Sequence, residues 1–272
     1  MWFIYFSISI LGLLFLLMFA IAPRRRRNTA PFDRTLYAHR GLHDNDDGVP
    51  ENSLAAFAAA AKAGYGVELD VQLTADRQVV VFHDNDLKRM CGIEKRVDEL
   101  TYAQLREYSL LSSDQHIPLL SDVLEVLDGV TLLCEFKAMR SYTDTSLCTA
   151  TLPLLDNYKG NVCIESFNPF MVRWFRKHAP HYIRGILAKK FTKEETTPVL
   201  RFILSSLLAN FLCRPDFIAY QHTDYKHPIL RLCRIFRPMT VAWTVTSPSE
   251  TTVAKQHFDT VIFEGFAPKI ND

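Results

Sequence analysis

The chain has 272 residues, of which 48% are hydrophobic and 22% charged, so most of it can bury a core. Its 31 Lys and Arg residues nearly balance its 30 Asp and Glu residues, which argues against nucleic acid as a partner. Its six cysteines contain no C-x-x-C pair, which excludes a zinc-finger spacing and predicts reduced, structural thiols rather than a disulfide framework.

The first predicted element is an apolar helix over residues 2–22, which contain no charged side chain. A helix of this length spans roughly 30 Å, the thickness of the hydrocarbon core of a bilayer. A cleaved signal peptide is the alternative, because Ala20-Ile21-Ala22 offers small residues of the kind found at cleavage sites. No positive charge precedes Trp2, however, and we therefore expect an uncleaved transmembrane anchor over residues 1–23.

A run of four arginines, Arg24 to Arg27, follows the apolar segment and opens a basic linker over residues 24–34. Positive charge is retained on the cytoplasmic side of membranes. We therefore expect a single-pass membrane protein whose remaining residues, 35–272, form a domain on the cytoplasmic side. The arginines would also lie against anionic headgroups.

Strand-like and helix-like segments alternate through the rest of the chain. Strands are predicted over residues 35–41, 66–74, 79–84, 131–137, 162–167, 182–187, 216–221, 240–246 and 259–265. Helices are predicted over residues 53–64, 101–110, 119–129, 146–158, 169–179, 198–212, 228–238 and 249–258. The first of these helices should begin at Asn52 or Ser53 and end at Gly64, and the third should be capped by Ser121.

Repeated strand–helix units with continuously apolar strands indicate a parallel sheet that is covered on both faces. About eight such units fit a (β/α)₈ TIM barrel, an α/β fold. A doubly wound open sheet is the alternative, but the chain has no Gly-rich dinucleotide turn to favour it.

Polar side chains stand at or near the ends of several predicted strands, where a barrel of this kind gathers its chemistry. Glu68 and Asp70 are two residues apart and so share one face of a strand, as do Glu135 and Lys137. The paired carboxylates could bind a divalent cation, and the lysine could hold a phosphate oxygen. Alternatively, Glu68 and Asp70 could form ion pairs with arginines, and Glu135 and Lys137 could simply neutralise each other.

Two histidines, His39 and His83, end predicted strands and could serve as general acid and general base. A structural role is the alternative for each. Arg40 offers a planar fork suited to phosphate.

The order of these motifs strongly resembles the glycerophosphodiester phosphodiesterase family over residues 35 to 265. The matching motifs are His39-Arg40-Gly41, Pro50-Glu51-Asn52-Ser53, Glu68-Leu69-Asp70-Val71, His83-Asp84, Ile117-Pro118-Leu119, Glu135-Phe136-Lys137, Ser166-Phe167-Asn168 and Trp243-Thr244-Val245.

The resemblance implies a TIM barrel with one Mg²⁺ or Ca²⁺ ion held by Glu68, Asp70 and Glu135. It implies that His39 and His83 are the acid–base pair, and that Glu51 and Asn52 support the site. It further implies that Arg40 and Lys137 hold the phosphate while Trp243 and Phe167 contact the rest of the substrate. The chain departs from the family at Glu264, where an aspartate is usual.

The reaction implied is hydrolysis of a glycerophosphodiester to sn-glycerol 3-phosphate and an alcohol, by attack of water or of the glycerol 2-hydroxyl. Cleavage of a membrane lysophospholipid, as by a lysophospholipase D, is an alternative suggested by the anchor and by the apolar segment 202–208, whose own alternative is core packing. An inactive barrel that serves as a membrane-bound partner is a third possibility. The stretch between His83 and Glu135 is short for a large capping domain, which predicts an open mouth. No obligate protein partner is indicated.

Overall fold

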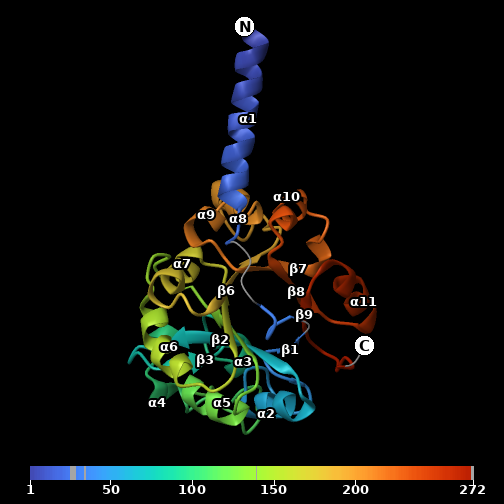
Figure 1. Ribbon diagram of the computed structural model, residues 1–272. Helices are drawn as coiled ribbons and strands as arrows, with labels where there is room; N and C mark the ends of the chain where they lie inside the picture. The colour runs from blue at the N-terminus through green and yellow to red at the C-terminus, as the bar shows by residue number, and fades with distance from the viewer. Residues whose placement is uncertain (25–28, 34, 139, 271–272) are drawn as a thin grey trace.

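The computed structural model describes residues 1–24, 29–33, 35–138 and 140–270. Figure 1 shows a single long helix, α1 (Trp2–Ile21), that projects from a rounded α/β domain. Nearly all of α1 is exposed, and among the described helices it alone is long and apolar enough to cross a membrane. Arg25, Arg26 and Arg27 of the predicted basic linker lie outside the described residues.

The domain is a closed parallel barrel, which confirms the predicted TIM-barrel fold. Within the described residues its eight strands run in the order β1-β2-β4-β5-β6-β7-β8-β9, and β9 pairs with β1 to close the ring. The strands are β1 (Leu36–His39), β2 (Gly66–Leu73), β4 (Leu132–Phe136), β5 (Val162–Ser166), β6 (Ile183–Ala188), β7 (Phe217–Gln221), β8 (Met239–Val245) and β9 (Thr260–Phe263).

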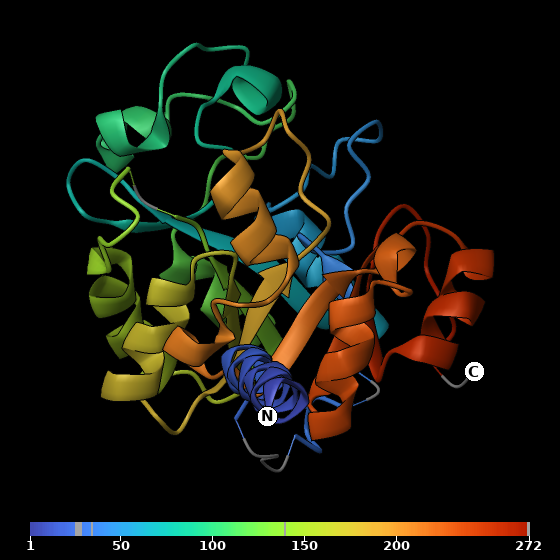
Figure 2. The ribbon, with the colours of Figure 1, turned by 90° about the horizontal axis from the view of Figure 1, so that it is seen from above.

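Helices surround the barrel as its outer layer (Figure 2). The longer ones are α2 (Leu54–Ala63), α5 (Leu120–Leu127), α6 (Ser146–Asp156), α7 (Pro169–His178), α8 (Pro198–Ser205) and α11 (Pro248–His257). The shorter ones are α3 (Lys88–Cys91), η1 (Val97–Glu99), α4 (Tyr102–Leu105), α9 (Asn210–Cys213), η2 (His222–Asp224), α10 (Pro228–Cys233) and η3 (Arg234–Phe236).

The segment predicted as a strand over residues 79–84 is not part of the barrel. Its ordered part, β3 (Val79–Val81), pairs antiparallel with the outer end of β2. After β3 the chain forms a small extension, residues 85–119, which packs around its own apolar cluster that includes Leu87, Met90 and Leu105.

The predicted ends of α2 are confirmed, whereas the predicted cap of α5 is wrong. The hydroxyl of Ser53 accepts a hydrogen bond from Ala56 N at 3.1 Å, and Gly64 ends the helix in the left-handed conformation, as expected. The cap predicted at Ser121 is wrong, because α5 begins after Leu119 and the Ser121 hydroxyl bonds to the adjacent Asp122.

The helix predicted over residues 198–212 is divided into α8 and α9. The side chain of Leu207 is buried in the core while its backbone takes a positive φ of 55°, which ends the helical run. At the end of α8 the Ser205 hydroxyl accepts a hydrogen bond from Phe191 N at 3.0 Å, so this turn is tied to the loop after β6.

The C-terminal end of α1 is packed into the domain. Ile21 is fully buried in the main core cluster, and Leu17 and Met18 pack against that cluster. The six cysteines are unpaired and five of them are buried, in agreement with structural thiols.

Candidate active site

The strand register brings the predicted acidic residues together at the carboxyl end of the barrel. Asp70 on β2 is paired with Glu135 on β4, and Glu68 on β2 is paired with His39 on β1. One carboxylate oxygen from each of Glu68, Asp70 and Glu135 lies within 4.8 Å of the others, and all three side chains are buried.

The electrostatics of these three carboxylates favour a bound cation. Burial, followed by repulsion from Asp70, raises the pKa of Glu68 well above its usual range. Burial also raises the pKa of Glu135, although Lys137 opposes this effect. A set of buried oxygen donors with unbalanced negative charge fits a hard cation such as Mg²⁺ or Ca²⁺.

Two basic side chains already neutralise part of this charge. Lys137 Nζ lies 2.8 Å from Asp70 Oδ1 and 2.9 Å from Glu135 Oε1. Arg40 Nε lies 3.4 Å from Asp70 Oδ2, and the Arg40 backbone N–H donates to Glu68 at 3.1 Å. Burial works against ionisation of Asp70, but Lys137 and Arg40 outweigh it and hold the Asp70 pKa well below its usual range. The ion pairs considered as alternatives are therefore present within the same cluster.

Glu51 and Asn52 support the site from the β1–α2 connection. Asn52 Nδ2 donates to Asp70 Oδ2 at 2.8 Å, which fixes that carboxylate. Glu51 accepts hydrogen bonds from Arg40 at 2.6 Å and from both terminal nitrogens of Arg89 at 2.7 and 2.8 Å. Glu51 thus orients Arg40, which in turn faces the acidic cluster.

The third position of the His39-Arg40-Gly41 motif requires glycine for a steric reason. Gly41 has a φ of 84°, and a Cβ at this position would lie 2.8 Å from the backbone carbon of Ala56 in α2. The chain must therefore pass directly beside α2, and this path places His39 and Arg40 over the barrel mouth.

His39 is held by Glu264, the residue expected from the sequence to depart from the family pattern. Its Nδ1 donates to Glu264 Oε2, and its Nε2 lies 3.9 Å from Glu68 Oε2. Burial lowers the pKa of His39, although Glu264 opposes the shift. His43 Nε2 lies 3.9 Å from the other Glu264 oxygen, so two histidines share one carboxylate.

His83 has a carboxylate partner of its own. Its Nδ1 donates to Asp84 Oδ1 at 2.6 Å, and Arg89 Nε donates to Asp84 Oδ2 at 2.7 Å. The side-chain amide of Gln72 donates to the backbone carbonyls of Phe82 and Asp84, both at 2.8 Å, and so fixes the backbone on either side of His83.

The aromatic residues predicted to contact the substrate form a group on the other side of the barrel. The rings of Phe167 and Trp243 meet edge to face with centroids 5.5 Å apart. Phe191, in the loop after β6, contacts Phe167 at 5.9 Å. These rings form an aromatic wall at the carboxyl ends of β5, β6 and β8.

Sequence reasoning missed four residues of this site: Arg89, Glu165, Phe191 and His43. Arg89, Phe191 and His43 lie in the α3 segment and in loops, and nothing in their spacing pointed to the site. Glu165 could have been found, because it is a lone carboxylate within an apolar strand, as Glu135 is. It is buried beside Glu135 in the strand register, and burial followed by Glu135 raises its pKa well above its usual range.

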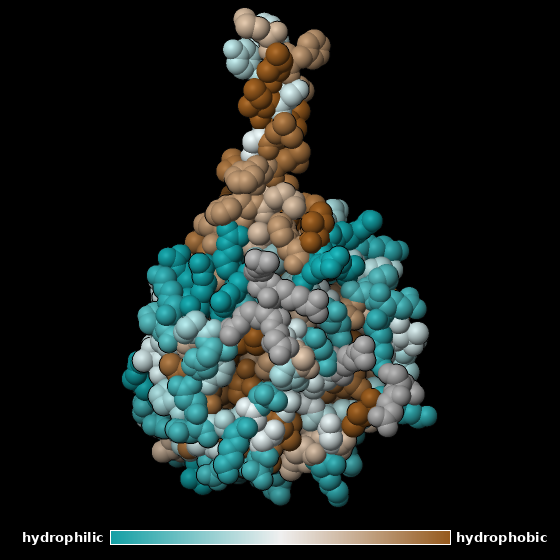
Figure 3. Space-filling view, viewed as in Figure 1, coloured by the Kyte–Doolittle hydropathy of each residue, from teal (hydrophilic) through white to brown (hydrophobic). Residues whose placement is uncertain are grey.

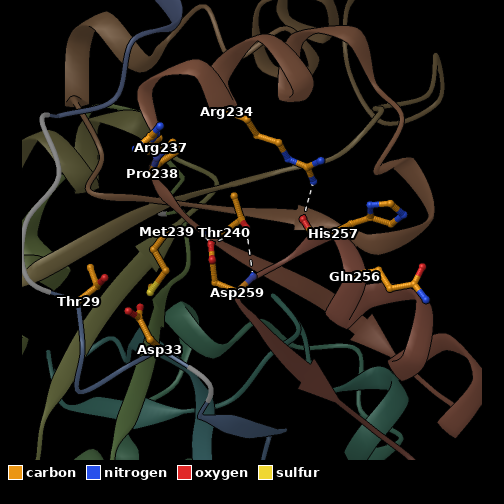
Figure 4. A pocket seen from close by; sticks show the side chains of 10 residues that line it. All are labelled: Thr29, Asp33, Arg234, Arg237, Pro238, Met239, Thr240, Gln256, His257 and Asp259. Carbon is orange, nitrogen blue, oxygen red and sulfur yellow. Dashed lines mark hydrogen bonds between the residues drawn. The ribbon is translucent and has the colours of Figure 1, made fainter.

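A separate cavity of about 270 Å³ lies at the opposite end of the barrel, where β8 and β9 begin. Figure 4 shows its lining residues, among them Asp33, Arg237 and Asp259. None of the predicted site residues lines this cavity, so it is separate from the acidic cluster.

Comparison with known proteins agrees with this arrangement. Residues 39–264 match the model of the glycerophosphoryl diester phosphodiesterase family. The chain is 32% identical over 162 residues to a glycerophosphodiester phosphodiesterase of Caldanaerobacter subterraneus subsp. tengcongensis, and 38% identical over 163 residues to one of Bacillus altitudinis. These alignments cover 55% and 56% of this chain and 65% of each relative. It is also 35% identical over 166 residues to the human lysophospholipase D GDPD1, covering 55% of this chain and 46% of that protein.

Solved structures show the same fold. An Oleispira antarctica phosphodiesterase in complex with the product sn-glycerol-3-phosphate superposes with a TM-score of 0.70 at 22% identity, over 86% of this chain and 94% of that one. A glycerophosphodiester phosphodiesterase of Thermotoga maritima superposes with a TM-score of 0.64 at 26% identity, over 84% and 94% of the two chains. With its barrel, its motifs in order and a family match that covers most of its length, the chain belongs to the glycerophosphoryl diester phosphodiesterase family.

Proposed function

We propose that the protein hydrolyses glycerophosphodiesters to sn-glycerol 3-phosphate and an alcohol. The observation that carries this proposal is that two carboxylate-paired histidines lie beside one buried acidic cluster: His39 Nε2 is 3.9 Å from Glu68 Oε2, and the charge of His83 acts on Asp70 and Glu135. Family membership supports it, as do the names of the relatives.

We assign the cation to Glu68, Asp70 and Glu135, and it would be Mg²⁺ or Ca²⁺. When bound, it would offset the negative charge that develops on the phosphoryl oxygens. Arg40 and Lys137 lie against the same carboxylates and would hold the non-bridging phosphate oxygens.

The two histidines would perform the proton transfers. His39 is the better candidate for the base, because burial lowers its pKa and Glu264 holds its Nδ1, so that Nε2 is free to accept a proton. The attacking oxygen would lose its proton to His39 as its bond to phosphorus forms. His83 would give a proton to the alcohol oxygen as the bond from that oxygen to phosphorus breaks. The attacking group is either water, which gives sn-glycerol 3-phosphate directly, or the glycerol 2-hydroxyl, which gives a cyclic phosphate that water must then open.

We further propose that α1 is an uncleaved anchor and that residues 35–272 form the catalytic domain on the cytoplasmic side. The length of α1, its lack of charge and its exposure support a membrane span. The four arginines that follow it support the orientation.

A second candidate is cleavage of membrane lysophospholipids. The aromatic wall of Phe167, Trp243 and Phe191 favours it, because Phe191 lies in the loop that leads to α8, on the face of the domain from which α1 emerges. The similarity to a human lysophospholipase D is a further reason to test it.

A substrate panel run with and without chelator tests the proposal. We expect purified full-length protein to release sn-glycerol 3-phosphate from glycerophosphocholine, and to lose this activity in EDTA. If only lysophosphatidylcholine were cleaved, the second candidate would be the correct one.

A catalytically inactive barrel is tested by replacing His39 and His83 individually with alanine. Each change should lower kcat by about 10²- to 10⁴-fold, the usual contribution of a general acid or base, while circular dichroism and the melting temperature stay close to those of the wild type. Unchanged turnover in both variants would contradict the assignment.

A further inference from the structure

The end of α1 is joined rigidly to the domain. Asn210 Nδ2 donates to the carbonyl of Ile21 at 2.8 Å, and Arg214 donates to the carbonyls of Phe19 and Ala22 at 2.7 and 2.8 Å. The last carbonyls of a helix have no partner within the helix, so these bonds hold α1 by its C-terminal end. The guanidinium of Arg214 also lies over the ring of Phe19, 4.3 Å from its centroid. Helix α1 is therefore in direct contact with α9.

Exposed apolar side chains stand on the face of the domain from which α1 emerges. They belong to α8, α9 and η3, which lie together with α10 on the face from which α1 emerges (Figures 1 and 2). We call this group the collar; it consists of Val199, Phe202, Phe211 and Ile235, with exposed fractions of 71%, 65%, 48% and 64%. The space-filling view shows apolar surface continuing from α1 onto this face (Figure 3).

Scattered exposed apolar residues are common on soluble proteins and need no explanation. The collar differs in its position. Beyond α1, the other large hydrophobic side chains exposed in the described part of the chain are Tyr142, Val253 and Ile270, with exposed fractions of 36%, 43% and 51%. The three most exposed of these seven side chains therefore all belong to elements on the face from which α1 emerges.

The charges of the collar segments indicate the chemistry of the surface that they would meet. Residues 198–214 and 228–238 together contain five arginines and neither aspartate nor glutamate. In the chain as a whole, acidic and basic residues are nearly equal in number. A surface that combines exposed apolar side chains with a local excess of positive charge suits the headgroup layer of an anionic membrane.

We propose that the collar is a second membrane contact, which inserts into the interfacial layer around α1. The proposal rests on α1 being a membrane anchor. The 20 residues of α1 span about 30 Å, which a bilayer core would use in full. Ile21, the last residue of that span, is itself buried in the domain, so the surface around it must reach the headgroups.

One consequence concerns access to the site. The loop from β6 to α8 joins the collar to Phe191, which contacts the aromatic wall at Phe167. A collar seated in the interface would therefore bring the apolar side of the site close to the bilayer.

Site-specific fluorescence on the full-length chain tests the collar. Cys91 is the half-buried native cysteine, so Cys91→Ser gives a background in which the other five are buried. Single changes Phe202→Cys and Ile235→Cys would carry an environment-sensitive NBD label, with Val253→Cys on α11 as the matched exposed control and Leu14→Cys in α1 as the anchor control. The protein would be reconstituted into vesicles of phosphatidylcholine and phosphatidylglycerol, containing a phosphatidylcholine spin-labelled near its headgroup.

We expect labels at positions 202 and 235 to show blue-shifted emission and quenching by the spin-labelled lipid, and the label at position 253 to show neither. If the labels at 202 and 235 show neither a blue shift nor quenching while the label at position 14 shows both, the collar proposal is wrong and the anchor proposal stands. A blue shift without quenching would overturn it in favour of a second copy of the chain covering the same face. A label at position 14 that reports water would overturn the anchor and the collar together. Hydrolysis of glycerophosphocholine by the same labelled proteins is measured separately, so failure of the catalytic proposal would be seen independently.

Discussion

At the scale of single residues, Glu264 shows how one carboxylate sets the orientation of a histidine. Its carboxylate accepts a hydrogen bond from His39 Nδ1, on the opposite side of the imidazole from the nitrogen that lies nearest the acidic cluster. A carboxylate in this position fixes the tautomer of the histidine and the direction of its second nitrogen. Glu264 is therefore a positioning residue for His39.

Replacing Glu264 with glutamine should lower kcat by about ten- to a hundredfold, the usual effect of losing a group that orients a functional histidine, with a smaller change in KM. Glu264→Asp keeps the carboxylate on a shorter side chain, so it should recover part of the loss. The pH profile of kcat should shift in Glu264→Gln, because the charge beside His39 is removed. Glu125→Gln, at an exposed position of α5, is the control; equal effects of Glu264→Gln and Glu125→Gln would contradict the positioning role.

Glu51 makes a prediction about stability in acid. Burial raises its pKa, but hydrogen bonds and charge from Arg89 and Arg40 outweigh burial and lower the pKa to about 2 from a usual value of 4.5. A carboxylate whose pKa is lower in the folded state stabilises the fold above its unfolded pKa, and this stability is lost as the pH falls through the folded pKa. At 1.36 kcal/mol per pH unit, the contribution is at most about 3 kcal/mol.

The free energy of unfolding of Glu51→Gln should accordingly be lower than that of the wild type at pH 7. The difference should shrink between about pH 4.5 and pH 2. Urea unfolding at pH 7, 4.5 and 2.5 measures both variants. A difference that stays constant across this range would show that Glu51 acts through its shape rather than its charge.

At the scale of elements, the period-2 pattern and the order of apolar segments were sufficient to predict the barrel strands. The same pattern placed Glu68 and Asp70 on one face, and the structure brings both together with Glu135. What the sequence did not reveal depends on tertiary contacts. The break between α8 and α9 follows from the burial of Leu207, and β3 leaves the barrel because it pairs antiparallel with β2. Arg89 reaches the site from the extension that follows β3, at a distance in sequence that no local pattern encodes.

Inside the barrel, Gly185 on β6 shows how one element limits its neighbour. Gly185 is paired with Phe217 on β7, and a Cβ at position 185 would lie 2.1 Å from Cε2 of the Phe217 ring. Gly185→Ala should therefore destabilise the domain by about 1–3 kcal/mol, the usual cost of overpacking a core.

Thermal or urea unfolding of a double-mutant cycle checks this origin. Phe217→Leu alone should also destabilise, because it leaves a cavity. In the double variant the alanine methyl occupies part of that cavity, so the combined loss should be smaller than the sum of the two single losses. Strictly additive losses would contradict a steric conflict between these two side chains.

At the scale of the whole molecule, the acidic cluster and α1 are held by different parts of one domain. The acidic cluster lies where the barrel strands end, while α1 is held by α9 in the outer ring of helices. The domain therefore carries its site and its proposed anchor on separate elements, and these are linked through the β6–α8–α9 connection. A substitution in the site can therefore be tested while the anchor stays intact, and a substitution in the anchor can be tested while the site stays intact.

Metal binding is the property that should report on the folded molecule as a whole. The buried carboxylates of Glu68, Asp70, Glu135 and Glu165 outnumber the cations beside them, Lys137 and Arg40. A divalent ion that binds only the folded state should stabilise it by about 2.7 kcal/mol at a hundred times its Kd. For a domain of this size, that corresponds to a rise in Tm of about 5–10 °C.

Adding Mg²⁺ or Ca²⁺ to EDTA-treated full-length protein in detergent should therefore raise the Tm and restore hydrolysis together. Asp70→Asn should fold but lose most of the rise in Tm, because it removes one negative charge from the centre of the cluster. The exposed Asp114→Asn, in the extension after β3, should keep the full rise. If Lys137 and Arg40 were sufficient to neutralise the carboxylates, neither ion would move the Tm of the wild type and EDTA would leave activity unchanged. That outcome would replace the metal site with an internal ion-pair network built from the same residues.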